Sequence, residues 1–354
     1  MIVFVSNYPD ASNMRDGMMQ RVDAIDSLVK DKERVYLDIS FKRNFKRKKI
    51  IKDKCIIEHV NFFVHFFIIK SILKDASRIY IHSLYNLLKV FVFFAPKKTI
   101  LDIHGVVPEE VKLVGKKNQA RIYDYIERKA IQKCSKLIHV TESMLEHYET
   151  KYKILISNRS IVLPIFESHE VYPSSDKWNE LPLNVVYAGG LQAWQNISLM
   201  VDVVSTLENS TLVDNYVFKF FFPENQLKHF SEKYKKSLHL KKLTFSSLPK
   251  NQIIPLLQTC HLGFVLRDDI LINKVACPTK LIEYLECGVV PIVKSPDIGD
   301  FNRLGYEFIL IDSFIKNDFA IEDIKIKAQN NYKVLKVFRE KTEQSKISLI
   351  EEFN

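Results

Sequence analysis

The sequence predicts an α/β protein built from two tandem Rossmann-like domains with a cleft between them. Short runs of β-branched and aromatic residues alternate with segments of helical periodicity along the chain. These runs are almost continuously apolar, which is typical of parallel strands covered by helices on both faces. The alternation stops between Pro164 and Pro182, where prolines and serines indicate a linker, and then starts again.

The first half of the chain carries the pattern of one such domain. Strands are predicted there at Ile2–Ser6, Arg34–Ile39, Cys55–Val60, Arg78–His82, Thr99–Ile103 and Lys136–Val140. The segment Gly17–Lys30 is predicted as a helix, because its apolar residues lie on one face: Met18, Val22, Ile25 and Val29. In sheets of this kind the ligand lies outside the carboxyl ends of the strands, so we expect it in the cleft between the domains.

The second half repeats the pattern. Strands are predicted at Leu183–Tyr187, Val217–Phe222, Leu262–Leu266 and Val289–Val293. Helices are predicted at Asn196–Glu208, Lys250–Thr259 and Pro278–Cys287, with a helical tail at Ile324–Phe353. No repeat with a solenoid period is present.

Composition excludes several classes of protein. With 47% hydrophobic and 27% charged residues, the chain has an ordinary globular composition. Its five cysteines form no CxxC pair, which argues against a disulfide framework or a zinc cluster and favours a reducing compartment. The apolar start ends at Ser6 without a basic segment, so it is not a signal peptide. The stretch Phe62–Leu73 is too short to span a bilayer, and we expect a cytoplasmic protein, soluble or membrane-peripheral.

The positive charge is concentrated in the first half of the chain. Positions 1–180 hold 31 Lys and Arg against 22 Asp and Glu, whereas the remainder holds 21 against 20. The run Lys42–Lys49, followed by the apolar stretch Phe62–Ile69, suits an anionic membrane surface; the alternative is a solvated loop and a buried helix. Nucleic acid is not an expected partner, because basic and aromatic residues are not interleaved on one module.

Several catalytic motifs are absent. The chain has no G-x-G-x-x-G and no Walker A motif, which removes the main support for a dinucleotide dehydrogenase or a P-loop NTPase. It also has no H-E-x-x-H and no G-x-S-x-G.

The segment beginning at Cys277 has the features of an anion-binding helix. Pro278 suits the first helical position, where its missing N–H costs nothing. The N–H groups of Thr279, Lys280 and Leu281 would then be free at the N-terminus, where the helix dipole favours an anion. Lys280 adds a full positive charge beside them.

Farther along the same helix, Glu283 lies on the face of Lys280 and offers two acceptor oxygens to a diol such as a ribose. Gly288 suits a left-handed C-cap. The alternative is an ordinary core helix in which Lys280 and Glu283 form a solvated pair.

From Glu283 to Val293 the chain resembles the signature of retaining GT-B glycosyltransferases of family 4. The resemblance implies that Glu283 binds the ribose of a nucleoside-diphosphate sugar and that the helix N-terminus holds the diphosphate. It implies transfer with retention at the anomeric carbon. No metal and no cofactor are expected, because the sequence has no plausible cluster of metal ligands. The chain departs from the family at Val275, where the family has a second glutamate near the transferred sugar; some members carry a pattern like Cys277–Lys280 instead.

Further pieces resemble the same family. Gly189 and Gly190 follow a strand and precede a helix, as in the family loop that faces the diphosphate sugar; a plain tight turn is the alternative. Arg267 ends a strand where the family has a basic residue against the diphosphate, and a planar guanidinium suits phosphate. Asp268 and Asp269 are interpreted as a solvated loop rather than as a metal-binding motif, because the spacing is wrong.

In the first half, His104 ends a strand and precedes a glycine, and the resemblance puts such a histidine near the donor sugar. It would bind the sugar or stabilise the leaving phosphate. Gly17 lies where the loop after the first strand enters a helix, and the resemblance implies contact with the diphosphate or acceptor. Glu109 and Glu110 follow in the sequence. They would either orient the acceptor or interact favourably with the dipole at the start of a helix.

Together these features predict a glycosyltransferase. Residues 1–166 are expected to bind the acceptor, residues 167–324 the nucleotide sugar, and residues 325–354 to form a helix that packs back on the N-terminal domain. The acceptor would be a glycan or a polyprenyl-diphosphate-linked sugar of surface polysaccharide biosynthesis. Two alternatives stay open: a sugar-nucleotide epimerase on the same fold, and a non-catalytic protein that binds glycans or a lipid surface.

Overall fold

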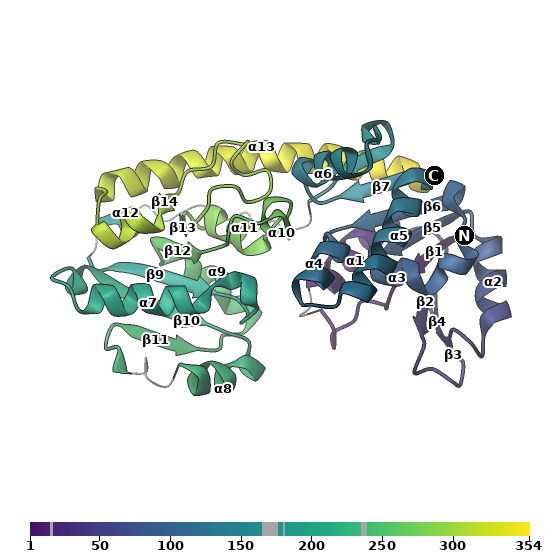
Figure 1. Ribbon diagram of the computed structural model, residues 1–354, viewed down its shortest axis with the longest axis horizontal. Helices are drawn as coiled ribbons and strands as arrows, with labels where there is room; N and C mark the ends of the chain where they lie inside the picture. Colours follow the sequence, from purple (N-terminus) through teal and green to yellow (C-terminus); the bar gives the residue numbers. More distant parts are fainter. Residues whose placement is uncertain (15–16, 165–175, 180, 235–238) are drawn as a thin grey trace. The chain divides into compact units, whose positions relative to one another are not determined.

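A computed structural model describes residues 1–14, 17–164, 176–179, 181–234 and 239–354. The chain divides into two compact units (Figure 1). Unit 1 comprises Met1–Ile165 together with Lys341–Asn354, and unit 2 comprises Phe166–Glu340. Most of the predicted linker between Pro164 and Pro182 lies outside the described residues.

Unit 1 contains an eight-stranded sheet in the order β3-β4-β2-β1-β5-β6-β7-β8. Its strands are β1 Ile2–Val5, β2 Arg34–Ser40, β3 Lys48–Lys52, β4 Cys55–Asn61, β5 Arg78–His82, β6 Thr99–Ile103, β7 Lys136–His139 and β8 Ser160–Val162. Every pairing is parallel except that of β3 with β4. The chain order reverses between β1 and β5, and such a switch point opens a crevice at the carboxyl ends of the strands.

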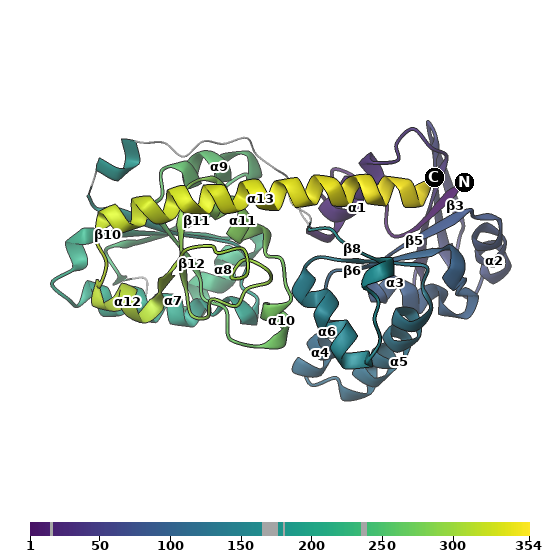
Figure 2. The same ribbon diagram turned by 90° about the horizontal axis from the view of Figure 1, so that it is seen from above.

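Helices cover both faces of this sheet (Figure 2). They are α1 Gly17–Ser27, α2 Phe66–Asp75, α3 Ser83–Val90, α4 Val107–Leu113, α5 Lys117–Lys133 and α6 Glu142–Tyr152. On one face Val22 and Ile25 of α1 pack against Phe4 and Tyr36 of the strands. Val22 and Ile25 therefore lie on the predicted buried face. Met19 is buried in place of the predicted Met18, and the helix ends at Ser27 rather than Lys30.

Unit 2 contains a six-stranded parallel sheet in the order β11-β10-β9-β12-β13-β14. Its strands are β9 Leu183–Ala188, β10 Tyr216–Phe221, β11 Leu243–Ser246, β12 Leu262–Val265, β13 Val290–Val293 and β14 Ile309–Leu310. The switch point lies between β9 and β12. Both units thus have the doubly wound arrangement that the sequence predicts.

The helices of unit 2 are α7 Ile197–Glu208, α8 Glu224–Lys233, α9 Lys250–Gln258, α10 Leu271–Lys274, α11 Thr279–Glu286 and α12 Ile311–Lys316. Alternate residues of β9 point into two separate cores, as strand geometry requires. Val185 and Tyr187 belong to the core that contains α7, whereas Val186 belongs to the core that contains α9 and α11. The sheet is therefore buried on both faces, which explains its continuously apolar strands.

The last helix, α13 Ile321–Phe353, contributes to both units. Near its start Ile324 and Ala328 pack into one core of unit 2, and Leu335 and Phe338 pack into the other. At its end Phe353 joins the core of unit 1. Within the described part of the chain, neither this helix nor any other is long and apolar enough to cross a bilayer.

The predicted strands are present, and no end is shifted by more than one residue. Strands β3, β8, β11 and β14 were not predicted. In β3 the basic residues Lys48 and Lys49 are exposed, so no apolar run marks it. It forms because an edge strand needs only one partner, and charged residues on an edge discourage further pairing.

Candidate functional site

In unit 2, the two connections that follow β9 and β12 start on either side of the switch point of the sheet (Figure 1). The loop after β9 supplies Gly189 and Gly190, the loop after β12 supplies Arg267, and α11 supplies Lys280. The Lys280 ammonium lies 3.7 Å from the centre of the Tyr187 ring. A Cβ at Gly189 would lie 2.6 Å from Lys280 Nζ, so the glycine makes room for the ammonium.

The N-terminus of α11 differs in one detail from the expectation. Pro278 is the N-cap rather than the first helical residue, and its carbonyl accepts the N–H of Leu281 at 3.0 Å. Of the three amides predicted to be free, only those of Thr279 and Lys280 lack an acceptor among the described residues. The Leu281 side chain is fully buried in the core. The helix therefore offers two backbone donors rather than three.

The C-terminus of α11 agrees with the expectation for Gly288. Its φ is 65°, in the left-handed region that favours glycine. The N–H of Val289 donates to the Tyr284 carbonyl at 2.8 Å, and that of Gly288 to the Leu285 carbonyl at 3.2 Å. These two bonds form a Schellman motif, which ends the helix just before β13.

Two contacts hold α11 against the rest of unit 2. The Tyr284 hydroxyl accepts the N–H of Ala188 at 3.1 Å, and its ring occupies the space where Gly263 has no side chain. A Cβ at Gly263 would lie 2.3 Å from the ring. At the other end of the helix the buried Glu286 pairs with Arg339 of α13 at 2.6 Å. These contacts set where Lys280 lies relative to the loop after β9.

Among the described residues, no carboxylate lies within ion-pair distance of Lys280 or Arg267. Lys280 Nζ donates to the Gln195 amide oxygen at 3.1 Å. Burial lowers the pKa of Lys280 well below its usual value, and nearby Arg267 lowers it further, against the opposing effect of Glu283. Burial also lowers the pKa of Arg267 to about 10, and its Nε has no hydrogen-bond partner within the described residues. Such a pair of cations favours an anion between them.

The neighbouring acidic residues are neutralised instead. Asp268 pairs with Lys294 and Asp269 pairs with Lys274 at 2.8 Å. This pairing is that of a solvated loop, as expected. Glu283 lies half-buried one turn after Lys280, and Thr279 is exposed at the helix start. Val275 is buried at the end of α10, so it offers no polar group where the resembling family has a glutamate.

In unit 1, a buried carboxylate lies beside the switch point. Asp102 of β6 accepts two hydrogen bonds from Arg21 of α1, from Nε at 2.7 Å and from the terminal nitrogen at 2.5 Å. It accepts a third from the Tyr80 hydroxyl at 2.6 Å. The Arg21 guanidinium offsets the effect of burial and holds the pKa of Asp102 below its usual range.

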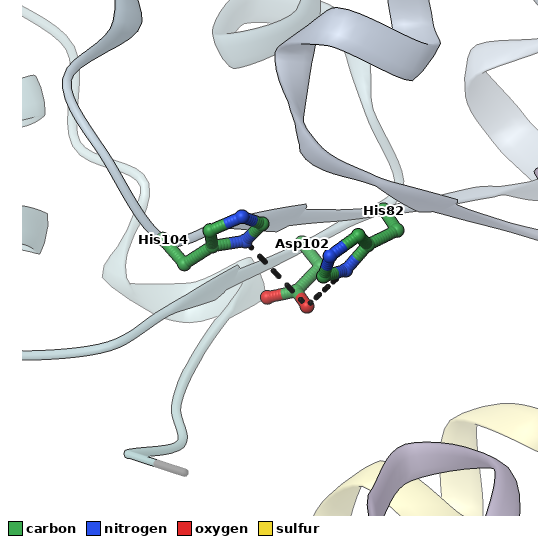
Figure 3. Close-up of side chains that lie close together, drawn as sticks. All are labelled: His82, Asp102 and His104. Atoms are coloured by element: carbon green, nitrogen blue, oxygen red, sulfur yellow. Dashed lines mark ion pairs between the residues drawn. The ribbon is translucent and has the colours of Figure 1, made fainter. Parts of the chain in front are cut away.

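His82 and His104 complete this cluster (Figure 3). Their rings stack with centroids 4.5 Å apart and planes 22° apart. His82 Nδ1 lies 3.4 Å and His104 Nδ1 lies 4.0 Å from an Asp102 oxygen. Next to His82, Ser83 is buried with a φ of 72°, a strained conformation for a residue other than glycine and one that is common at functional sites.

His82, Asp102 and His104 lie close enough to be considered as metal ligands. Their geometry does not suit a metal ion. Two imidazoles that share a metal direct in-plane lone pairs to one point, whereas these rings stack face on. The Asp102 oxygen that faces both rings already accepts bonds from Tyr80 and Arg21. The cluster is therefore a hydrogen-bond network around one ion pair.

The remaining candidates of unit 1 are Gly17, Glu109 and Glu110, and they differ in their surroundings. Gly17 is the first residue of α1, is exposed and would leave room for a side chain, so sterics do not require glycine there. Glu109 pairs with Lys151 at 2.8 Å. Glu110 folds back to Gly105, where a Cβ would lie 2.4 Å from its carboxylate, and burial raises its pKa.

Sequence reasoning identified His104 but not Asp102, Arg21, Tyr80 or His82. The signal that was available is Asp102 itself, a charged residue inside an apolar strand. A carboxylate in that position is almost never buried without a partner. The partner could not be named, because Arg21 and Asp102 lie 81 positions apart in the chain.

Comparison with known proteins gives matches by structure alone: no family model and no curated protein matches the sequence. A structure described as trehalose-6-phosphate from E. coli bound with UDP-2-fluoro glucose matches with a TM-score of 0.64 and 12% identity over 99% of this chain and 98% of that one. Sucrose-phosphate synthase from Thermosynechococcus elongatus matches with a TM-score of 0.62 and 11% identity over 99% of this chain and 96% of that one. WaaG, a glycosyltransferase involved in lipopolysaccharide biosynthesis, matches with a TM-score of 0.56 and 12% identity over 99% of this chain and 94% of that one.

These matches cover nearly the whole chain, and the proteins matched are GT-B glycosyltransferases. The chain therefore has the GT-B fold, as the sequence predicts. Identities of 11–12% establish the fold and leave the activity to be argued from the residues.

Proposed function

We propose that this protein is a glycosyltransferase that uses a nucleoside-diphosphate sugar as donor. The observation that carries the proposal is the pair of cations without carboxylate partners, Lys280 and Arg267, at the switch point of unit 2. A diphosphate would supply the missing negative charge, and the free amides of Thr279 and Lys280 add donors to it. The GT-B fold, shared with a structure that holds UDP-2-fluoro glucose, supports the same ligand.

In the proposed reaction the bond between the anomeric carbon and the diphosphate oxygen breaks, and a bond forms to an acceptor hydroxyl, which loses its proton. Lys280, Arg267 and the two backbone amides would stabilise the charge that develops on the leaving diphosphate. The loop at Gly189 and Gly190 would lie against the donor, and Glu283 would accept hydrogen bonds from the ribose. The family resemblance favours retention at the anomeric carbon. No requirement for a metal is expected, because the sequence has no plausible cluster of metal ligands.

Binding is tested before turnover. The melting temperature would be measured with UDP, GDP, dTDP and CMP, and affinity for the best ligand by calorimetry. Glu283→Ala is expected to weaken nucleotide binding at least about tenfold, as the loss of a charged hydrogen-bond acceptor implies. Glu322→Ala, on the exposed start of α13, is the matched control and should bind normally. Equal affinity of Glu283→Ala and the wild type would remove Glu283 from the site.

Turnover then separates the three candidate functions. Incubation with radiolabelled nucleotide sugars gives a labelled acceptor for a transferase, an isomeric nucleotide sugar for an epimerase, and neither for a binding protein. Transfer is expected to persist in excess EDTA. Loss of transfer in EDTA that Mn²⁺ or Mg²⁺ restores would contradict the metal-independent mechanism.

For the acceptor, we propose a glycan or a polyprenyl-diphosphate-linked sugar of surface polysaccharide biosynthesis, reached at an anionic membrane. An aromatic patch on unit 1 supports this proposal. Its members are phenylalanines linked by ring contacts: Phe41, Phe62, Phe63, Phe66, Phe67 and Phe93. Phe41, Phe63 and Phe67 are 37%, 68% and 79% exposed. Aromatic side chains in water next to basic ones are typical of surfaces that enter the lipid interface.

The patch is held in place by Asn61, which is fully buried at the end of β4. Its side-chain amide donates to the carbonyls of Phe41 and Arg43 at 3.3 and 2.9 Å. Its oxygen accepts the N–H of Phe63 at 3.0 Å. The hydrogen bonds of Asn61 thus connect the basic loop after β2 with the aromatic turn after β4.

The basic run contributes less charge than its composition suggests. Arg47 is paired with Glu58 at 2.7 Å, so its charge is partly neutralised. Lys46, Lys48 and Lys49 are exposed, and no described carboxylate pairs with them. Each such lysine near an anionic surface contributes about 1 kcal/mol.

Co-sedimentation with vesicles tests this surface. The protein should bind vesicles that contain anionic phospholipid and should bind neutral vesicles far less, with binding that falls as salt rises. Replacing Lys46, Lys48 and Lys49 with Ser should reduce binding, and Phe63→Ser with Phe67→Ser should do so at any salt. Leu155→Ser is the matched control, because Leu155 is 72% exposed in unit 1 and outside the patch. Wild-type protein that stays in solution at low salt would contradict the proposal.

A further inference from the structure

We infer that Arg21, Asp102, Tyr80 and His82 form a positioning network that presents His104 as a neutral imidazole with a hydrogen-bond-accepting Nε2. This inference rests on the proposed function, since it concerns how the same site recognises its substrate. It decides between the two roles that the sequence leaves open for His104. A neutral accepting nitrogen binds a hydroxyl of the substrate, and it does not stabilise a phosphate.

The first step follows the hydrogens around Asp102. A carboxylate only accepts hydrogen bonds, so the Tyr80 hydroxyl donates its one hydrogen to Asp102 across 2.6 Å. The Tyr80 oxygen then acts as acceptor in its 3.2 Å contact with His82 Nδ1. His82 therefore carries its hydrogen on Nδ1, and the Asp102 oxygen at 3.4 Å favours the same tautomer. Its Nε2 is a buried acceptor without a partner in the described chain.

The second step concerns the ring that stacks on His82. His104 Nδ1 is buried, has no hydrogen-bond partner among the residues described, and lies 4.0 Å from the Asp102 carboxylate (Figure 3). A negative charge at that distance favours the tautomer that directs an N–H toward it. The His104 side chain is 17% exposed. Because Nδ1 is buried, the exposed part is the opposite edge of the ring. Nε2 then presents a lone pair to whatever ligand reaches this edge.

The third step concerns charge. Burial lowers the pKa of His104 to about 3, and the stacked His82 and the Arg21 guanidinium lower it too, against the opposing effect of Asp102. These groups face His104 from β5, α1 and β6, and Glu110 of α4 lies beside the adjacent Gly105. A second positive charge beside Arg21 is unfavourable, so the imidazole stays neutral.

The chemical consequence is a preference between ligands. A diphosphate is an acceptor at neutral pH, so its oxygens repel the lone pair of Nε2. A sugar or acceptor hydroxyl donates to the same lone pair. A neutral imidazole has a single N–H, and in His104 this hydrogen lies on Nδ1, which faces Asp102. His104 therefore has no hydrogen to donate from its outer edge.

Nuclear magnetic resonance of protein labelled in its histidines tests the tautomer directly. His104 should give the ring nitrogen shifts of the neutral Nδ1–H form at pH 7 and keep them at pH 5, where an ordinary histidine is charged. Asp102→Asn should mix the two neutral tautomers. If that variant does not fold, the wild-type spectrum still decides. A charged His104 at pH 7, or an Nε2–H tautomer, would overturn the inference.

Two substitutions of His104 test the role during transfer. Gln offers a carbonyl oxygen in place of Nε2, so His104→Gln should keep the specificity constant within about tenfold. Lys offers a cation, which would serve a phosphate but not a hydroxyl donor, so His104→Lys should lose about a hundredfold or more. The reverse order would overturn the inference. Absence of transfer by the wild-type protein would contradict the proposed function, whereas the tautomer measurement does not depend on it.

Discussion

At the scale of single residues, the charged forms of Lys280 and Arg267 are unfavourable in the free protein. Both are largely withdrawn from water, and the pKa of each is lowered by burial. A buried cation without a carboxylate destabilises the free protein, and such sites persist where a ligand supplies the opposite charge. The same residues are therefore expected to matter more for ligand binding than for folding.

This expectation predicts that removal of a cation lowers transfer activity without lowering the stability of the fold. Lys280→Ala and Arg267→Ala should each lower transfer by about 10²–10³-fold, the range for loss of one group that stabilises developing charge. Because the pKa of Lys280 is lowered on folding, its charged form is unfavourable in the folded state, so Lys280→Ala should leave the melting temperature unchanged or higher. Rates and melting curves measured on the same preparations check both parts.

Lys274→Ala is the matched control, since Lys274 is exposed and pairs with Asp269 on the surface. It should leave transfer unaltered. Equal losses for Lys274→Ala and Lys280→Ala would mean that general positive charge, rather than this site, determines the rate.

Single residues also show what the sequence could predict about the site. Lys280, Gly189 and Arg267 each follow a strand or begin a helix, so local pattern and family resemblance were enough to select them as candidates. Asp102 and Arg21 come from different elements, and their pairing depends on how the first helix packs on the sheet. Local sequence contains no information on that pairing.

At the scale of elements, the position of α11 depends on a contact between a glycine and a tyrosine. Gly263 lies in the middle of β12, where glycine normally weakens a strand. Here it lets the Tyr284 ring approach the sheet and bond to Ala188. The sequence predicted both elements, but the role of Gly263 appears only when they are packed together.

We therefore predict that Gly263→Ala moves α11 away from β9. The added methyl group would overlap the Tyr284 ring, and overpacking of this kind costs about 1–3 kcal/mol. Nucleotide binding should weaken together with stability. Gly305→Ala serves as a comparison: its φ of 80° makes alanine strained there, but no atom lies within 4 Å of the added carbon.

Chemical denaturation and calorimetry distinguish the two variants. Both should lose stability, and only Gly263→Ala should also lose nucleotide affinity. Normal affinity in Gly263→Ala would show that the Tyr284 contact does not set the position of Lys280.

At the scale of the whole molecule, α13 belongs to both units. Its end is bound to unit 1 by several contacts: Phe353 packs on Phe4 with ring centres 6.3 Å apart, and Glu352 pairs with Lys136 at 2.9 Å. Arg78 also donates to the Glu352 carbonyl at 2.8 Å. The helical tail was predictable from periodicity, but these partners come from strands hundreds of positions earlier in the chain.

Phe353→Ala should accordingly destabilise unit 1 by about 3–5 kcal/mol, the usual cost of removing a buried phenylalanine. Hydrogen exchange followed by mass spectrometry locates the effect. Protection should fall in β1 and β5 and should be retained in β9 and β12. Ile347→Ala is the control, because Ile347 is exposed on the same helix. Uniform loss of protection across both units would contradict this assignment.

The contribution of α13 to unit 1 has a consequence for synthesis of the protein. Domains generally fold as units while the chain emerges from the ribosome, beginning with the N-terminal one. Here the core around Phe4 and Tyr80 lacks Leu349 and Phe353 until residues 341–354 have been translated. Unit 2, by contrast, lies within one continuous stretch, Phe166–Glu340. The unit whose strands are made first is therefore completed last, and its nascent form exposes apolar surface for chaperones to cover.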